Sequence, residues 1–225
     1  MSKGDRKTTL WSSALPSPAD QFELKRQALI KEAGRAFARI GYHNASLEGV
    51  AKMLGVTKTA LYYYVRSKEE ILFECKKYAL DLAESARDRA ISEGNSAEEK
   101  LRLWMTYYIE ALTGEQGARA VLSEPISSLT EEHQQHIIKR RAGFERELRN
   151  LVSMGVSEGA FARCEPKLAV AFFMGGINGI NRWYSPEGEF SGSEIASAFV
   201  RFIISGLTAM PSADLPDNNV RPASF

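Results

Sequence analysis

The segment from residue 57 to residue 66 combines side chains that suit contact with a nucleic acid. The ammonium of Lys58 can donate to guanine acceptors, and the methyl group of Thr59 can touch a thymine methyl. A phenol hydroxyl can donate to phosphate oxygens, and Tyr62 and Tyr63 face outward on a helical wheel. The wheel turns four residues inward, namely Thr57, Leu61, Tyr64 and Val65. The pattern predicts a short helix with one buried stripe and one face that meets DNA.

Two further residues are candidates for phosphate contacts because each opens a predicted helix. Ser46 offers a hydroxyl and Lys68 an ammonium where helix N-termini also present free N–H groups. Taken alone, the tyrosines could equally be packing residues and Lys68 a solvated charge, but the order of the surrounding elements favours DNA contact. The predicted DNA contacts are Ser46, Thr57, Lys58, Thr59, Tyr62, Tyr63 and Lys68.

The elements that must position these residues are three helices separated by glycines. Apolar residues with helical spacing predict a helix over 22–40 that ends at Gly41, and another over 47–54 that ends at Gly55. With the helix over 57–66, they have the spacing of a helix-turn-helix, whose last helix enters the major groove. Ser67 and Glu70 form a capping box that begins a long fourth helix.

The same region resembles the TetR family of repressors. The resemblance covers about residues 22–72, and one departure is Thr59, where members often carry Gly. It implies an all-α homodimer that binds a two-fold symmetric operator as a transcriptional repressor and releases it when a small hydrophobic ligand occupies the larger domain. The motifs that carry it are Gly41-Tyr42, Ala45-Ser46-Leu47, Val50-Ala51, Leu54-Gly55-Val56-Thr57, Leu61-Tyr62-Tyr63-Tyr64 and Lys68-Glu69-Glu70.

The chain is therefore predicted to divide into four parts. A basic tail covers 1–20 with Lys3, Arg6 and Lys7, and a helix-turn-helix DNA-binding domain covers 21–67. A helical ligand-binding and dimerisation domain covers 68–210, and a C-terminal tail covers 211–225. No sustained period-two pattern predicts a strand. Within the larger domain we expect helices over 96–112, around Ala118, and over 130–154, 166–184 and 193–209.

The last two predicted helices are the candidate dimer interface. The helix over 166–184 is apolar on nearly all sides before Asn178, and Gly175, Gly176 and Gly179 permit close approach of another helix. With the helix over 193–209 it can form a four-helix interface with a second copy. Two core helices within one chain would give a similar pattern, and this alternative stays open.

Aromatic and polar side chains in the larger domain form a candidate ligand site, although the same stripe would also suit a core. The stretch Asn181–Gly188 also resembles a subset of the family that senses acyl-coenzyme A thioesters. Coenzyme A phosphates would need cations, which a charged helix offers unless its face is merely solvated. These cations are Lys139, Arg140, Arg141, Arg146 and Arg149. The predicted ligand contacts are Trp104, Tyr107, Tyr108, Phe172, Phe173, Asn178 and Arg182.

Composition and missing motifs limit the other function classes. Residues 1–72 carry twelve Lys and Arg against seven Asp and Glu, so the positive charge gathers at the amino end. The three histidines and two cysteines match no catalytic set and no metal pattern, so we expect no enzyme, no cofactor and no metal. We find no signal peptide and no apolar run long enough for a membrane, and we expect a cytoplasmic protein. An architectural DNA-binding protein without ligand response is the alternative.

Overall fold

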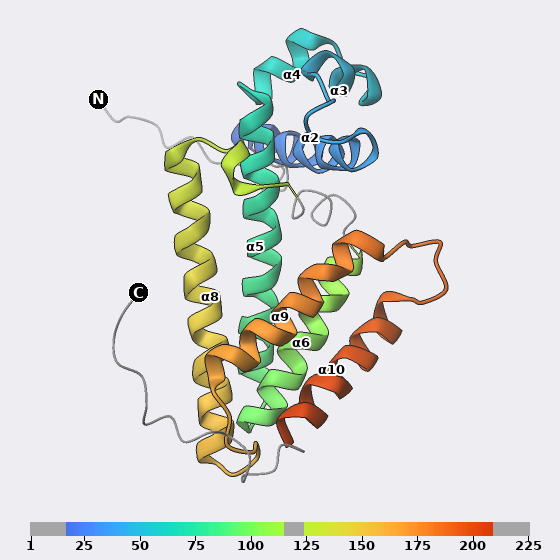
Figure 1. Cartoon of the computed structure of the whole chain (residues 1–225). Helices are drawn as coiled ribbons and strands as arrows, with labels where there is room; N and C mark the ends of the chain where they lie inside the picture. The colour runs from blue at the N-terminus through green and yellow to red at the C-terminus, as the bar shows by residue number, and fades with distance from the viewer. Residues whose placement is uncertain (1–16, 115–123, 209–225) are drawn as a thin grey trace, which may run out of the picture.

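The computed structural model describes residues 17–114 and 124–208. These residues form eight α-helices and one 3-10 turn, with no strand among them, which confirms the predicted all-α fold. Three helices form a small head at one end of a larger helical body (Figure 1). The tail residues Lys3, Arg6 and Lys7, the helix expected around Ala118, and the tail over 211–225 lie outside the described residues.

The head consists of α2 (Pro18–Ile40), α3 (Leu47–Met53) and α4 (Lys58–Tyr64). The prediction that the tail reaches residue 20 is wrong, because Ser17 and Asp20 form a capping box that begins α2 at Pro18. Gly41 follows the end of α2 and Gly55 follows the end of α3. Their φ angles are 80° and 66°, in the left-handed region that favours glycine. Their conformation lets the chain reverse direction after each of the two helices.

The helix α5 (Lys68–Glu93) runs from the head into the body beside α8 (Figure 1). Its first turns belong to the head's hydrophobic core, to which they contribute Ile71, Leu72 and Cys75. The same core contains Leu129 and Ile137 from the body's side. The head therefore does not pack as a unit that stops at residue 67, as the predicted division implies, because its small core needs these extra side chains.

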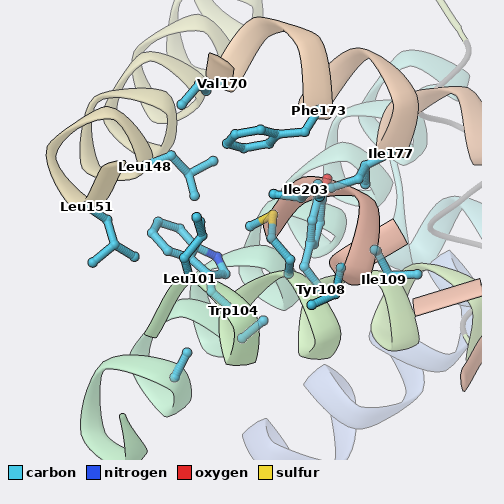
Figure 2. Close-up of a cluster of buried hydrophobic side chains, with 14 of the residues drawn as sticks. Leu101, Trp104, Tyr108, Ile109, Leu148, Leu151, Val170, Phe173, Ile177 and Ile203 are labelled. Atoms are coloured by element: carbon cyan, nitrogen blue, oxygen red, sulfur yellow. The ribbon is translucent and has the colours of Figure 1, made fainter. Parts of the chain in front are cut away.

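The body is built from α6 (Ala97–Gly114), α8 (Glu131–Ser157), α9 (Pro166–Trp183) and α10 (Gly192–Thr208), with a 3-10 turn over Ile126–Ser128. The helix α6 packs against α5, α8 and α10. Side chains from α5, α6, α8, α9 and α10 meet in one buried cluster, part of which is drawn in Figure 2. Those labelled in the figure include Leu101, Trp104, Ile109, Leu148, Phe173, Ile177 and Ile203.

The loop that follows α8 packs closely against its neighbours. A Cβ atom on Gly155 of α8 would lie 2.1 Å from Cδ2 of Phe161, so the ring occupies the space that a side chain would need. The Ala162 amide donates to the Leu207 carbonyl over 2.9 Å, which ties the loop after α8 to the end of α10. The body is thus a closely packed scaffold around the sites described below.

Candidate DNA-binding surface and ligand cavity

The helix α4 presents one buried stripe and one exposed face. Leu61 and Val65 are almost completely buried, whereas Tyr62 and Tyr63 are 45% and 70% exposed. Thr59 is exposed on the same side of the helix. The arrangement is the one a recognition helix requires, since the side chains that would read bases stay in solvent.

The hydroxyls of Ser46 and Thr57 act as helix caps. Ser46 accepts from the Gly49 amide over 3.0 Å and begins α3, and Thr57 accepts from the Ala60 amide over 3.1 Å and begins α4. Thr57 is exposed, so the inward orientation that the helical wheel gave it is wrong. A cap residue lies outside the helical repeat, and the wheel therefore does not apply to it.

Lys58 is paired with a residue of the preceding helix. Its ammonium forms an exposed ion pair with the Glu48 carboxylate, and it lies 6.0 Å from the ring centroid of Tyr62. This hydrogen bond lowers the pKa of the Glu48 carboxyl. The Glu48 carboxylate therefore competes with DNA for the Lys58 ammonium, and Glu48 is a residue of this surface for which the sequence carried no signal.

The three consecutive tyrosines have different surroundings. Tyr64 stacks on Phe22 of α2 with ring centroids 5.0 Å apart, and Tyr63 meets the same ring edge-on at 5.3 Å. Tyr63 thus keeps its hydroxyl in solvent while one edge of its ring is braced. The helical wheel correctly separated Tyr64 from its two neighbours, but it gave no sign of Phe22 as their support.

The ammonium of Lys68 binds the loop between α2 and α3. It donates to the carbonyl oxygens of Tyr42 and Ala45 over 2.8 Å and 3.0 Å, and to that of His43 over 3.4 Å. Its three N–H groups are therefore already directed at carbonyls. Contact between Lys68 and phosphate stays a prediction, and the structure adds a role in holding the loop that leads to Ser46.

Arg26 of α2 fixes the other side of the head. Its guanidinium donates to Glu70 over 3.0 Å, to Glu74 over 3.1 Å and to the Tyr64 carbonyl over 3.2 Å. One side chain thus joins α2, the end of α4 and the start of α5. Arg26 carries no local signal in the sequence, because its partners lie 38 to 48 residues away.

A cavity of about 290 Å³ lies among α5, α6, α8 and α9 of the body. Three of the predicted ligand contacts line it, namely Tyr108, Asn178 and Arg182. A larger groove of about 560 Å³ lies between α2 and α5, but charged side chains such as Glu23, Lys31 and Asp81 line much of it. The remaining cavity residues are Ala79, Leu80, Ala83, Arg141, Phe144, Glu145, Met174 and Asn181.

The other four predicted ligand residues lie elsewhere. Trp104 and Phe173 are buried in the body core (Figure 2). Trp104 meets Phe144 edge-on at 5.0 Å. Phe172 is 85% exposed. The Tyr107 hydroxyl donates to Glu93, and Arg89 covers its ring at 3.8 Å. Grouping all seven residues in one pocket is therefore wrong, because adjacent residues on a helix face different directions.

The cations predicted to bind coenzyme A phosphates also lie in different surroundings. Arg140 pairs with Asp81 over 2.7 Å and with Glu84 over 2.8 Å, which leaves it committed to α5. Arg141 lines the cavity, whereas Arg146 is exposed on α8. Only the contacts with other helices distinguish these arginines, since all of them belong to one charged stretch of sequence.

Large apolar side chains lie uncovered on α9 and α10. Phe172 and Phe202 are 85% and 69% exposed, and Leu168 and Trp183 are 67% and 53% exposed. A Cβ atom on Gly175, Gly179 or Gly206 would meet no neighbouring atom within 4 Å. This outer face, on the two helices predicted for the dimer interface, is unusually apolar for a surface that meets water.

The described residues contain no candidate metal site and no candidate membrane span. No group of three or more His, Cys, Asp or Glu side chains there could hold a metal ion. Among the same residues, no helix is long and apolar enough to cross a membrane.

Two protein-family models match this chain. A model described as "Bacterial regulatory proteins, tetR family" matches residues 29–75, and one described as "Tetracyclin repressor-like, C-terminal domain" matches residues 94–207. The chain is 23% identical over 185 residues to the fatty acid metabolism regulator protein of Bacillus subtilis (strain 168), covering 81% of this chain and 95% of that protein.

Solved structures show the same fold. The TetR family transcriptional regulator PfmR from Thermus thermophilus is 31% identical, with a TM-score of 0.74 over 80% of this chain and 98% of that one. AibR, solved in complex with isovaleryl coenzyme A and operator DNA, is 25% identical, with a TM-score of 0.71 over 79% of this chain and 97% of that one. The second family model alone spans just over half of this chain, and the chain therefore belongs to the TetR family of bacterial transcriptional regulators.

Proposed function

We propose that this protein is a transcriptional repressor that binds a two-fold symmetric operator as a homodimer and releases it when a small acyl ligand binds. An acyl-coenzyme A thioester is the first candidate for that ligand. The observation that carries the DNA-binding part is the exposed face of α4, with Thr59, Tyr62 and Tyr63 in solvent above a buried Leu61. Operator DNA lies in the cytoplasm of a bacterium, which is where we expect the protein to act.

The homodimer is supported by the uncovered apolar face of α9 and α10. Burying Phe172 and Phe202 against a second copy would remove large aromatic surfaces from water, at about 25 cal/mol per Å². A two-fold interface also brings two heads together, and each head reads only half of a symmetric site. Major grooves on one face of DNA repeat about every 34 Å, which sets the spacing the dimer must give its α4 helices.

The acyl ligand is supported by the cavity and by the named relatives. The lining combines apolar groups such as Leu80, Phe144 and Met174 with a few polar ones, which is typical of small-molecule sites. AibR was solved with isovaleryl coenzyme A, and the Bacillus subtilis relative is named for fatty acid metabolism. An acyl chain therefore suits both the apolar lining and the chemistry of these relatives.

The helix α5 connects the cavity to the head. Its residues Ala79, Leu80 and Ala83 line the cavity, while Ile71 and Leu72, about two turns earlier, belong to the head's core. A ligand that favours a different position of α5 would move the head with it, and the two α4 helices of a dimer would lose the spacing of successive major grooves.

The test is a DNA-binding titration of the purified protein against its own upstream DNA, with random DNA as competitor. We expect binding to the upstream fragment to exceed binding to random DNA by at least about a thousandfold. Acyl-coenzyme A esters of increasing chain length are then added, and at least one of them should release the fragment. Equal binding to random DNA would contradict the repressor, as an architectural protein would show no sequence preference.

A further inference from the structure

Arg141 is a cation inside the body that forms no ion pair. Its neighbour Arg140 contacts two carboxylates of α5, whereas Arg141 makes no ion pair or hydrogen bond with any residue in the described part of the chain. Arg141 is half-buried and lines the cavity. Among the described residues its guanidinium donors are therefore free for a ligand with a matching negative group.

Tyr108 adds a hydrogen-bond donor to the same cavity. It is 6% exposed, and its hydroxyl contacts no described polar group. In Figure 2 this hydroxyl points away from α6, toward Ile177 on α9. Burial raises the pKa of Tyr108 to about 12, so the hydroxyl keeps its proton at neutral pH. The hydroxyl is therefore a donor with no acceptor among the described residues, and a ligand oxygen in the cavity would supply one.

The other charges around the cavity also favour an anion. Arg182 is a second arginine of the lining, and Glu145 is its one carboxylate, so the ionic lining residues sum to one positive charge. The buried ammonium of Lys76 lies near enough that Arg141 contributes to lowering its pKa to about 8. Two cations that repel each other in the body would both be stabilised by one negative charge between α5 and α8.

We propose that the cavity binds its acyl ligand through an oxyanion, a carboxylate or a phosphate, which Arg141 and the Tyr108 hydroxyl hold together. The proposal rests on the proposed function only in taking the ligand to be an acyl compound. A guanidinium presents two parallel donors to such a group, and Tyr108 supplies a third. At about 290 Å³ the cavity is near the lower limit for ligand sites.

The experiment measures direct binding to the full chain by titration calorimetry with three probes of one chain length. Octanoate carries a carboxylate, octanoyl-coenzyme A carries phosphates, and the octanoyl thioester of N-acetylcysteamine carries no charge. Butyrate and decanoate with the corresponding derivatives extend the series. We expect at least one charged probe to bind about tenfold or more tightly than the neutral thioester, since a charge-assisted contact is lost with the anion.

Three substitutions identify the residues. Arg141→Met keeps the apolar stem and removes the charge, and it should reduce binding of the charged probe to the level of the neutral one. Tyr108→Phe removes only the hydroxyl and should weaken the charged probe a few-fold. Arg146→Met is the matched control on the exposed face of α8. It should leave the binding of the charged and of the neutral probe unchanged. Circular dichroism checks that each variant is folded.

The outcomes separate this proposal from the proposed function. Binding of octanoate that depends on Arg141 identifies a carboxylate, and binding of octanoyl-coenzyme A alone that depends on Arg141 identifies a phosphate. Equal binding of the neutral thioester, an unchanged Arg141→Met variant, an equal loss in Arg146→Met, or no binding of any charged probe would overturn the oxyanion site. Operator release that persists in Arg141→Met would leave the repressor intact and remove the oxyanion site. Binding of a charged probe that depends on Arg141 but does not release the operator would keep the oxyanion site and contradict the ligand-released repressor.

Discussion

The Nζ atom of Lys68 lies 2.8 Å from the carbonyl oxygen of Tyr42 and 4.4 Å from the centroid of its ring. One ammonium at the start of α5 thus holds both the backbone and the side chain of the residue that follows Gly41. The same ammonium reaches the Ala45 carbonyl, directly before the cap of α3. The entry into the helix-turn-helix is therefore fastened to the helix whose later turns line the cavity of the body.

Replacing this lysine should loosen the head. Lys68→Met leaves the carbonyls of Tyr42, His43 and Ala45 without this donor, and we expect the free energy of unfolding to fall by about 1 to 2 kcal/mol. Operator affinity should fall for all sequences, because the loop before α3 loses its anchor. Thermal unfolding and operator titrations at several salt concentrations measure the two effects. A melting temperature equal to that of the unmodified protein would show that the contacts of Lys68 with the loop carbonyls do not stabilise the fold. A smaller slope of log affinity against log salt concentration, by about one, would show that Lys68 also contacts phosphate.

Releasing Lys58 from its ion pair should strengthen DNA binding. Glu48→Gln removes the carboxylate that occupies the ammonium, along with a negative charge beside the DNA-binding face. We expect tighter operator binding and a salt dependence steeper by about one unit, since one more cation becomes available to the DNA. Fluorescence anisotropy with labelled operator measures both, with Glu98→Gln on α6 as a control for the change in net charge. Weaker binding by Glu48→Gln would indicate that the pair positions Lys58 for its contact.

Thr59 should influence which sequence is bound. Its side chain is exposed near the start of α4, where it can touch a thymine methyl. Thr59→Ala should change the preferred base at one position in each half-site by about 1 kcal/mol and leave the melting temperature unchanged. Selection from a library of randomised operators reads the preference directly. An identical preference in the variant would place Thr59 outside the base contacts.

The apolar face of α9 and α10 should control the oligomeric state. Phe172→Glu places a charge at the most exposed aromatic side chain of the body, and we expect a monomer that has lost most of its operator affinity. Sedimentation velocity measures the mass. Ile138→Glu is the control, since Ile138 is an exposed apolar residue of α8, and it should remain dimeric. A dimeric Phe172→Glu protein would move the interface to another surface.

Lys76 should make stability rise with pH. Burial is the main cause that lowers its pKa to about 8, from an ordinary value of 10.5. Below pH 8 both the folded and the unfolded chain hold the proton, so stability is flat. Between pH 8 and 10.5 the unfolded chain still holds a proton that the folded chain has lost, and Lys76 adds up to about 1.4 kcal/mol per pH unit.

The measurement compares urea unfolding of the unmodified protein with Lys76→Met from pH 7 to pH 10. Groups that titrate in both proteins, including Cys75 with its raised pKa, largely cancel in the difference. Stability of the unmodified protein should increase relative to the variant above pH 8. Parallel curves would mean that Lys76 titrates near its ordinary pKa.

The local signals in the sequence determined the helices and the position of the helix-turn-helix. The caps Ser46 and Ser67 and the glycines 41 and 55 act within one turn, through hydrogen bonds and backbone conformations that depend on few neighbours. The spacing of Leu61 and Val65 likewise separated the buried side of α4 from its exposed side. These features are readable from residue types and distances along the chain.

Only the tertiary structure decided which partner each polar side chain has. Lys58 and Glu48 are ten residues apart, Arg26 and Glu74 are 48 apart, and Arg140 and Arg141 are adjacent but face different surroundings. Periodicity assigns a residue to a face of its helix, but it does not say what covers that face. For the same reason Tyr108 and Tyr107, consecutive in sequence, end up in the cavity and against Glu93.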